Sequence, residues 1–391
     1  MAGTADRFDP TDLVALGIGL DAIELEMQQR ARDFVEAHVL GEVAAWYADE
    51  MLPRELARAL GAAGLLGLDV PGCGPEVGPV AVGLVMLELE AADSGVRSLA
   101  SVHSSLAMHA ISRFASEEEQ ARWLPGMSSG DVLGCFALTE PDAGSDPRSM
   151  RTRARRSGSD WVLDGEKRWV TNGGIADVAV VWAVADEQIR GFLVPLGTLG
   201  ADVRPINGRL SLRASVSSEL ALDGCRIPAG HALPGAVGLR AALACLDEAR
   251  YGIAWGAMGA ARTCFVAALD HSLARRQFGK QLAAFQLTQA KLATMAVELE
   301  KGLLLAHHLG LTKRAGRLRP EQVSVGKVGN VRAALEIARI ARTVLGAEGI
   351  TLGRAVMRHM TNLEAVLTYE GTEEVHLLAI GRALTGLDAF A

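Results

Sequence analysis

The spacing of apolar residues divides the chain into three parts. From about residue 20 to 130, apolar side chains such as Met27 and Ala31 recur every three or four positions, which is typical of helices. From about 132 to 235 the pattern changes to short runs rich in valine and tryptophan, separated by turn-forming residues. Beyond about 238 the helical spacing returns and lasts almost to the C-terminus. The chain therefore reads as α, then β, then α.

This pattern predicts individual elements and a domain organisation. Ser116 followed by Glu119 has the spacing of a capping box, which marks the start of a helix. The runs predicted to be strands are Val132–Leu138, Trp161–Leu163, Arg168–Thr171, Val178–Val184 and Phe192–Pro195. We predict an α+β multidomain fold with an N-terminal helical domain (1–131), a middle β-domain (132–236) and a C-terminal helical bundle (237–391).

Composition excludes several classes of protein. The chain has 391 residues, 49% of them hydrophobic, and a net charge of −7, so it offers no basic footprint for nucleic acid. Its five cysteines are far apart and form no Cys-x-x-Cys pair, so neither a disulfide framework nor a zinc site is indicated. The histidines lack the spacing of metal ligands, so we predict no metal.

The N-terminal segment does not look like a targeting sequence. It contains Asp6, Asp9, Asp12 and Asp21 and lacks a basic stretch followed by an apolar one. Apolar stretches such as 80–87 are interrupted by acidic residues before they reach the ~20 residues of a membrane span. We expect a cytoplasmic protein without a membrane span.

Two segments of the middle part have features of a ligand site. Residues 136–146 run from an apolar strand into a turn, where Gly144 would allow a ligand to approach the backbone. Residues 169–172 place a tryptophan beside a threonine at the end of a strand. Taken separately, the first segment equally suits a turn that closes a hairpin, and the tryptophan suits the core.

Near the C-terminus, Glu370 lies between Tyr369 and Gly371 within helical sequence. A carboxylate held between an aromatic ring and a flexible glycine has the setting of a catalytic base, because burial beside the ring would raise its pKa. Taken alone, the same residues suit a solvated glutamate at a helix boundary.

Together these three segments resemble the acyl-CoA dehydrogenases, and the resemblance extends over essentially the whole chain. It implies an enzyme that uses FAD to introduce a double bond into an acyl-CoA thioester, with Glu370 as the catalytic base. It also implies contacts to FAD from Phe136, Leu138, Thr139, Gly144, Ser145, Trp169, Thr171, Gly346, Thr372 and Glu374. The family usually has Gly-Gly where this chain has Gly346-Ala347, so one of these contacts departs from the family pattern.

The resemblance also makes assembly part of the prediction. In the family, residues matching Arg275, Gln277, Phe278 and Gln286 contact the FAD of a neighbouring subunit. The arginine is suited to this role, because its guanidinium donates paired hydrogen bonds to a pyrophosphate. A homotetramer is therefore implied, and electron-transfer flavoprotein is the implied electron acceptor.

Other positions resemble the substrate-binding residues of the family. Asp247 and Arg250 match residues that hold the pantetheine part of CoA, although their spacing also suits an ion pair within a helix. Ser145, Tyr369 and Gly371 are also implied to bind the substrate.

The far end of the substrate is indicated by Glu90, Arg97, Ser98 and Ser101. An arginine and a hydroxyl one helical turn apart can bind a carboxylate, although a lone helical arginine usually extends to solvent. These residues and several other segments resemble the glutaryl-CoA dehydrogenase branch, whose substrate ends in a carboxylate. The chain departs from that branch in having Val96 where a tyrosine is common and His103 where glutamine is common.

Three functions follow from these observations. The first is oxidation and decarboxylation of glutaryl-CoA to crotonyl-CoA, which Glu90 and Tyr369 favour because both match the branch members that release CO2. The second is dehydrogenation of another short-chain or dicarboxylic group on CoA or on an acyl carrier protein, for example in secondary metabolism. The third is a non-catalytic helical scaffold, which would have lost the base or the flavin-binding residues.

Overall fold

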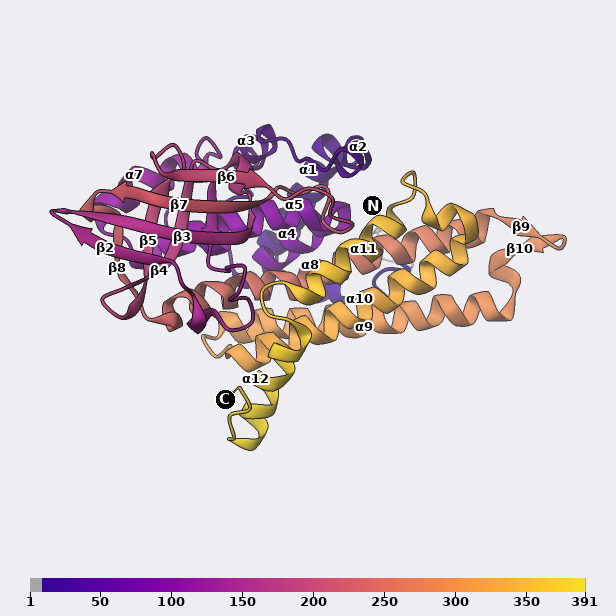
Figure 1. The fold of residues 1–391 in the computed structure, drawn as a ribbon. Coiled ribbons are helices and arrows are strands. Elements are labelled where there is room, and N and C mark those ends of the chain that lie inside the picture. Colours follow the sequence, from indigo (N-terminus) through magenta and orange to yellow (C-terminus); the bar gives the residue numbers. More distant parts are fainter. Residues whose placement is uncertain (1–8, 391) are drawn as a thin grey trace.

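The computed structural model describes residues 9–390, and residues 1–8, including Asp6, lie outside this range. The chain forms N-terminal helices, then a sheet, then a bundle of long helices (Figure 1), which confirms the predicted fold class. The sheet lies at one end of the molecule, and the bundle extends away from it to a small hairpin at the other end.

The N-terminal part is helical from α1 onward. Its α-helices are α1 (Ala22–His38), α2 (Val43–Asp49), α3 (Glu55–Ala62), α4 (Pro79–Ala92), α5 (Ser94–Ser101), α6 (His109–Phe114) and α7 (Glu117–Ser128). A π-helical segment, Val102–Met108, joins α5 to α6, and such segments are frequent near functional sites. Ser116 caps α7 as predicted, but the Glu119 carboxylate accepts from Trp123 Nε1 at 2.7 Å instead of completing the capping box.

The middle part is one mixed sheet with the order β6-β7-β3-β2-β4-β5-β8, and β1 pairs with β4. Its strands are β1 (Gly134–Ala137), β2 (Arg153–Ser157), β3 (Asp160–Thr171), β4 (Val178–Ala185), β5 (Gln188–Pro195), β6 (Ala201–Pro205), β7 (Ser217–Ile227) and β8 (Ala232–Val237). The runs predicted at 161–163 and 168–171 are one strand, β3, because its pairing with β7 continues across two register shifts.

Strand β4 is apolar at every position because both faces of the sheet are covered. Val180 and Trp182 pack against the N-terminal helices, whereas Val181 packs against residues of β3 and β7 such as Trp161 and Leu220. This explains why the sequence shows a continuous apolar run here instead of an alternating one.

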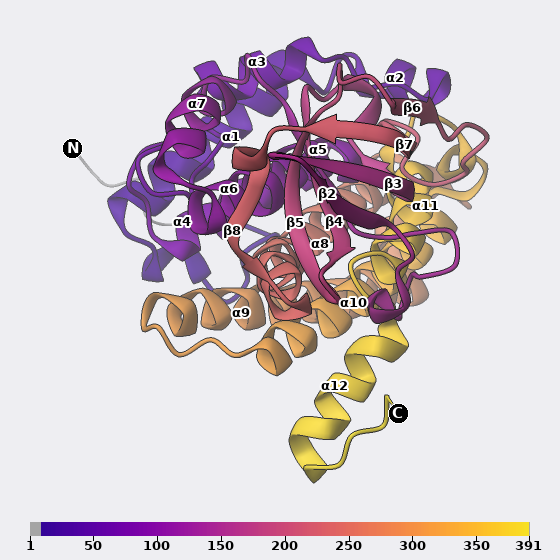
Figure 2. The ribbon, with the colours of Figure 1, turned by 60° about the vertical axis from the view of Figure 1, so that its left-hand side comes forward.

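The C-terminal part consists of α8 (Leu239–Ala274), α9 (Gln286–Arg314), α10 (Pro320–Leu345), α11 (Ala355–Thr368) and α12 (Glu373–Thr385), with a hairpin of β9 (Arg276–Gln277) and β10 (Lys280–Gln281). Among the described residues, α8 alone is long and apolar enough to cross a membrane, but 72% of its most apolar window is buried. It is the central helix of the bundle. In both views α12 projects away from the rest of the chain (Figures 1 and 2).

Glycines bring α8 and α4 unusually close together. A β-carbon at Gly256 would overlap Glu90 Oε2, and one at Gly259 would overlap the Leu87 carbonyl oxygen. On α4 itself, a β-carbon at Gly83 would overlap the Trp255 ring. The contact between these two helices therefore fixes the position of Glu90.

Candidate active site

The segment 369–371 is a short, strained loop between two helices. Helix α11 ends at Thr368, and the Thr372 hydroxyl caps α12 by accepting from Val375 N at 3.3 Å. Between them, Glu370 has a φ of 52° and Gly371 a φ of 95°. Residues other than glycine rarely adopt a positive φ, and such strain persists where the surrounding structure enforces it.

The Glu370 carboxyl group is buried beside basic side chains. Its Oε2 atom is buried and has no hydrogen-bond partner among the described residues. Burial raises the pKa of Glu370, and the cations Arg97, Lys327 and Arg250 offset part of that rise. A carboxyl group with a raised pKa and a free oxygen is suited to taking up a proton.

The backbone carbonyls of this loop are held by basic side chains. Lys327 Nζ donates to the carbonyl oxygens of both Tyr369 and Gly371, the latter at 2.6 Å. Arg250 Nε donates to the Glu370 carbonyl oxygen at 2.8 Å, and His376 Nε2 lies 3.3 Å from the same oxygen. Lys327 and His376 were not among the predicted site residues, since one basic residue within helical sequence gives no sign that it is buried.

A buried ion pair lies on the other side of Tyr369. Arg97 Nε donates to Glu90 Oε2 at 2.7 Å, and both side chains are fully buried. The Arg97 guanidinium also bonds to the Tyr369 hydroxyl. Burial alone would lower the pKa of Arg97, but Glu90 and Tyr369 raise it, so the guanidinium is charged. The structure thus brings the predicted Glu90, Arg97 and Tyr369 together.

Several polar atoms around Arg97 have no partner. They are Arg97 Nη1, Ser98 Oγ, Ser101 Oγ and Glu90 Oε1, all buried in the described structure. Buried polar atoms are usually hydrogen-bonded, so unpaired donors beside a charged guanidinium indicate a site for an anionic or polar ligand group.

The helix carrying Arg97 is anchored by residues that the sequence did not single out. Asp93 caps α5 by accepting from Gly95 N at 2.7 Å. The other oxygen of Asp93 accepts from Arg358 Nε and Asn362 Nδ2, both at 3.0 Å and both on α11. Helix α11 therefore supports the Arg97 end of the site at one point and leads into the Glu370 loop at its C-terminus.

Asp247 and Arg250 form the ion pair that their spacing allowed, at 2.9 Å. Because Arg250 also bonds to the Glu370 carbonyl, the pair links the Glu370 loop to α8. Asp247 lines a cavity of about 310 Å³ together with Arg113, Glu248, Lys313 and Arg319.

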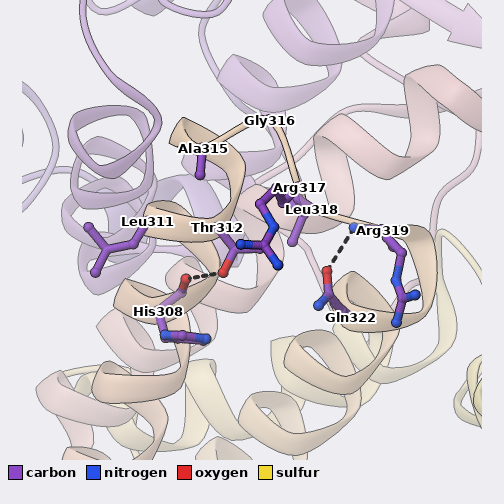
Figure 3. Close-up of a pocket in the computed structure, with 9 residues that line it drawn as sticks. All are labelled: His308, Leu311, Thr312, Ala315, Gly316, Arg317, Leu318, Arg319 and Gln322. Carbon is purple, nitrogen blue, oxygen red and sulfur yellow. Dashed lines mark hydrogen bonds between the residues drawn. The ribbon is translucent and has the colours of Figure 1, made fainter.

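A larger cavity of about 800 Å³ adjoins this one but does not reach Glu370. It lies between the end of α9 and the start of α10, where His308, Thr312 and Arg317 face Gln322 (Figure 3). Gly316, Leu318 and Arg319 line both cavities. We therefore assign the chemistry to the Glu370 region on its geometry and not to the larger opening.

The predicted cofactor residues of the sheet form one group. Trp169, near the end of β3, is 54% exposed and has a φ of 59°, so a strained backbone presents a bare aromatic ring. Beyond it, Asn172 donates to the Leu99 carbonyl at 3.2 Å, which joins the Thr171 end of β3 to the helix that carries Ser98 and Ser101.

The loop from 136 to 146 is held in place by the buried side chain of Lys167. Phe136 and Leu138 are buried, whereas Gly144 and Ser145 are exposed and Thr139 is half-buried. Lys167 is buried and donates to the Leu138 carbonyl at 3.0 Å and to Glu140 at 2.8 Å. An open glycine loop beside an exposed tryptophan suits the phosphates and flat ring of a flavin dinucleotide.

The other predicted cofactor residues lie elsewhere. Arg275 follows α8, Gln277 and Phe278 belong to the β9–β10 hairpin, and Gln286 begins α9; all four are exposed. This hairpin and the sheet lie at opposite ends of the molecule (Figure 1). Gly346, at the end of α10, and Glu374, in the first turn of α12, are also exposed, and Thr372 is half-buried. One chain therefore does not gather all the predicted cofactor residues.

Comparison with known families matches all three parts of the chain. The N-terminal domain of acyl-CoA dehydrogenase matches residues 22–131, its middle domain residues 135–225, and its C-terminal domain residues 236–385. Among curated proteins, the human mitochondrial short-chain specific acyl-CoA dehydrogenase is 34% identical over 363 residues, which are 90% of this chain and 87% of that protein.

Solved structures give closer matches. The crystal structure of glutaryl-CoA dehydrogenase from Mycobacterium smegmatis is 56% identical, with a TM-score of 0.97 over 98% of this chain and 100% of that one. A glutaryl-CoA dehydrogenase from the same organism in complex with FADH2 is 52% identical, with the same TM-score and coverage.

Proposed function

The chain belongs to the acyl-CoA dehydrogenase family, and we propose that its substrate is glutaryl-CoA, which it oxidises and decarboxylates to crotonyl-CoA. It is an FAD-dependent enzyme, so the scaffold function is ruled out. The choice of substrate, the roles of single residues and the release of CO2 are parts of the proposal.

One observation carries the choice of substrate. Among the described residues, the charged, buried Arg97 has no partner for its Nη1, and the hydroxyls of Ser98 and Ser101 on the same helix are also buried without a partner. A purely hydrocarbon chain would leave these donors unsatisfied and would pay their desolvation. The distal carboxylate of a dicarboxylic acyl group would accept from all three. The similarity to glutaryl-CoA dehydrogenases supports a five-carbon group.

We assign the removal of the α-proton to Glu370. Its buried Oε2 is free to accept a proton, and burial raises the pKa of the carboxyl group, which makes it a stronger base than a solvated glutamate. FAD held in this site would supply the acceptor for the β-hydrogen, which leaves as a hydride. Trp169 and Thr171 would hold the flavin ring, so that the chain's own residues orient the two reacting carbons.

The strained loop serves this step in a second way. The Glu370 backbone N–H makes no hydrogen bond to another described residue, because the loop leaves the helical path at Tyr369. A free amide next to the base is suited to donate to the thioester oxygen, on which negative charge develops as the α-proton leaves.

Decarboxylation would follow in the same pocket. The bond between the γ-carbon and the distal carboxylate breaks, CO2 leaves, and the electron pair moves through the new double bond to the thioester. Glu370, protonated by the first step, returns the proton to the γ-carbon, which gives crotonyl-CoA. Glu90, already paired with Arg97, would keep that guanidinium from holding the leaving carboxylate too tightly.

The CoA part of the substrate would occupy the cavity of about 310 Å³ that Asp247 lines. Arg113 and Arg319 line it and add positive charge, which suits the phosphates of CoA. We also propose a homotetramer in the cytoplasm, with electron-transfer flavoprotein as the acceptor. The exposure of Arg275, Gln277, Phe278 and Gln286 far from Trp169 supports assembly, since these residues would reach FAD only on another subunit.

The test compares glutaryl-CoA with butyryl-CoA, which lacks the distal carboxylate. Arg97→Met should lower kcat/KM for glutaryl-CoA by roughly 100-fold and affect butyryl-CoA far less. Ser101→Ala is the milder partner variant, because it removes one donor without leaving Glu90 unpaired. Equal effects of Arg97→Met on both substrates would contradict the assignment.

The product identifies the second half of the reaction. Anaerobic mixing of the wild type with glutaryl-CoA should bleach the flavin and yield crotonyl-CoA and CO2. Glutaconyl-CoA as the final product would support oxidation without decarboxylation. Faster bleaching by butyryl- or isovaleryl-CoA would favour the alternative of another short-chain substrate, which the similarity to the human short-chain enzyme supports.

A further inference from the structure

Lys327 is the least expected charged residue near the base. It lies on α10 and is 1% exposed, and α10 packs against both α8 and α12. Its Nζ donates to the carbonyl oxygens of Tyr369 and Gly371, the two residues that flank Glu370 in the chain. Its side chain therefore holds the Glu370 loop from both sides without occupying the position of the carboxyl group.

The loop needs such support because its backbone conformation is unfavourable. Glu370 has a φ of 52°, and a residue with a β-carbon leaves that conformation unless its neighbours are held. A β-carbon at Gly371 would lie 3.0 Å from His376 Nε2 and 3.3 Å from Arg250 Nη2, so the loop is also closely packed.

The three carbonyls of the loop are held by different helices. Arg250 on α8 and His376 on α12 share the Glu370 carbonyl, whereas Lys327 on α10 alone holds the other two. Loss of Arg250 would leave His376 beside the central carbonyl, but loss of Lys327 would free both flanking peptides. Among the described residues, no other side chain duplicates the contacts of Lys327 to these two carbonyls.

We propose that Lys327 is a positioning residue of the dehydrogenation step: it holds the strained Glu370 loop so that the Glu370 carboxylate points at the α-carbon and its amide at the thioester oxygen. The proposal rests on the role of Glu370 proposed above. It differs from a purely structural role because the loop orientation governs the rate of proton removal and not only the stability of the fold.

The charge of Lys327 adds a second, measurable effect. The cations that act on Glu370 are Arg97 from α5, Arg250 from α8 and Lys327 from α10, and all three oppose the rise in its pKa caused by burial. Burial lowers the pKa of Lys327 itself to about 7, while Glu370 opposes that change. Tyr369, whose pKa is raised by burial, and His376, whose pKa is lowered to about 3 by burial, are neutral neighbours.

The test uses Lys327→Met and Lys327→Arg in the FAD-loaded enzyme, with rates expressed per bound flavin. Lys327→Met should slow anaerobic flavin reduction by about 100-fold, because a base displaced by about 1 Å loses that much rate. Exchange of the substrate α-proton with D2O should slow by the same factor. The apparent KM should change little, since Lys327 does not reach the acyl or CoA positions.

The pH profile separates positioning from charge. In Lys327→Met the acid limb of the reduction rate, which reports the Glu370 pKa, should move to higher pH, because one of the three cations is lost. In Lys327→Arg the charge remains, so the limb should stay close to the wild-type position while the rate is still reduced by the altered geometry. Lys301→Met, an exposed lysine on α9, is the matched control and should change neither quantity.

Two outcomes would overturn the proposal. One is a Lys327→Met enzyme with a lower melting temperature but a wild-type rate per flavin and an unshifted pH profile, which would show that Lys327 only stabilises the fold. The other, used if Lys327→Met does not fold, is a Lys327→Arg enzyme with the wild-type rate. All rates are measured with whichever thioester the wild type oxidises fastest, so failure of glutaryl-CoA in the wild type counts against the substrate and not against Lys327.

Discussion

The acyl end and the cofactor end of this site are built in opposite ways. At the acyl end, Arg97 and Glu90 are fully buried and held by helices of the same chain. At the cofactor end, Trp169 is 54% exposed and Phe278 is 93% exposed; Trp169 belongs to the sheet, whereas Phe278 belongs to the hairpin at the other end of the molecule. A single chain brings the residues of the acyl end together, but it does not bring the residues of the cofactor end together.

The difference has a physical reason. A charged group buried in a core must be paired, because an uncompensated buried charge is costly, and this pairing requires neighbours in fixed positions. A long dinucleotide can instead be bound by surfaces that meet on assembly. We therefore expect changes at the acyl end to alter catalysis and specificity, and changes at the hairpin to alter cofactor affinity.

The largest effect should come from Glu370→Gln. The amide keeps the shape of the carboxyl group but cannot accept the α-proton, so the rate of flavin reduction should fall by about 10⁴-fold. Anaerobic stopped-flow with an acyl-CoA measures this rate. Glu364→Gln, on the exposed side of the preceding helix, is the control and should leave the rate of flavin reduction unchanged. A fall of less than tenfold would mean that the base lies elsewhere.

Next in size is Arg275→Ala at the hairpin. Loss of a charge-assisted hydrogen bond to a phosphate should weaken FAD binding by about 100-fold. Fluorescence titration of the apoenzyme measures this affinity. Arg240→Ala, an exposed arginine at the other end of α8, is the control. Unchanged affinity would indicate that the Trp169 group binds FAD without the hairpin, and the contrast between the two ends would disappear.

A smaller effect is expected where the acyl end depends on close helix packing. In Gly256→Ala the new methyl group would overlap Glu90 Oε2, so the unfolding free energy should fall by about 2 kcal/mol. Urea unfolding of the FAD-loaded enzyme measures it. Gly381→Ala in α12, where a β-carbon meets no neighbouring atom, is the control. Equal stability of the two variants would show that Glu90 moves freely.

The smallest effect concerns His103, which joins the N-terminal helices to the sheet. Its Nε2 lies 2.9 Å from the Met127 carbonyl oxygen, and its Nδ1 accepts from Gly134 N at 3.0 Å at the start of β1. Burial lowers its pKa from 6.5 to about 4. The unfolded chain therefore binds more protons between these values, and stability present at pH 7 is lost as the pH falls.

From pH 7 to 5.5 this loss amounts to about 1 kcal/mol for His103 alone. His103→Gln should remove that part of the pH dependence, which urea unfolding at the two pH values measures. The control variant His308→Gln changes an exposed histidine and should keep the full pH dependence of stability. If both variants keep the full dependence, His103 is solvated in the folded enzyme.

Prediction from sequence worked best where a residue's chemistry is visible in its neighbours along the chain. The helical and strand regions followed from apolar spacing, and the structure also brings Glu90, Arg97 and Tyr369 together. Strands β2, β6, β7 and β8 were not among the predicted runs. In β2, for example, four of the five residues are polar, and its pairing depends on β3 and β4.

Residues that position Glu370 and the Arg97 helix were missed for a similar reason. Lys327 is an ordinary helical lysine in sequence and is buried only because α10 packs against α8 and α12. Asp93 and Arg358 are 265 positions apart, so their ion pair has no sequence signature.

The sequence by itself determined the order of helical and β regions and the family, and it supplied the residues that we propose for proton transfer and carboxylate binding. These depend on side-chain chemistry and on periodicities that neighbouring residues share. Only the tertiary structure decided which charges are desolvated, which donors lack a partner and what holds Glu370 in its strained conformation. Those properties arise from contacts between helices far apart in the chain, and burial changes the strength and the pKa of each charged group.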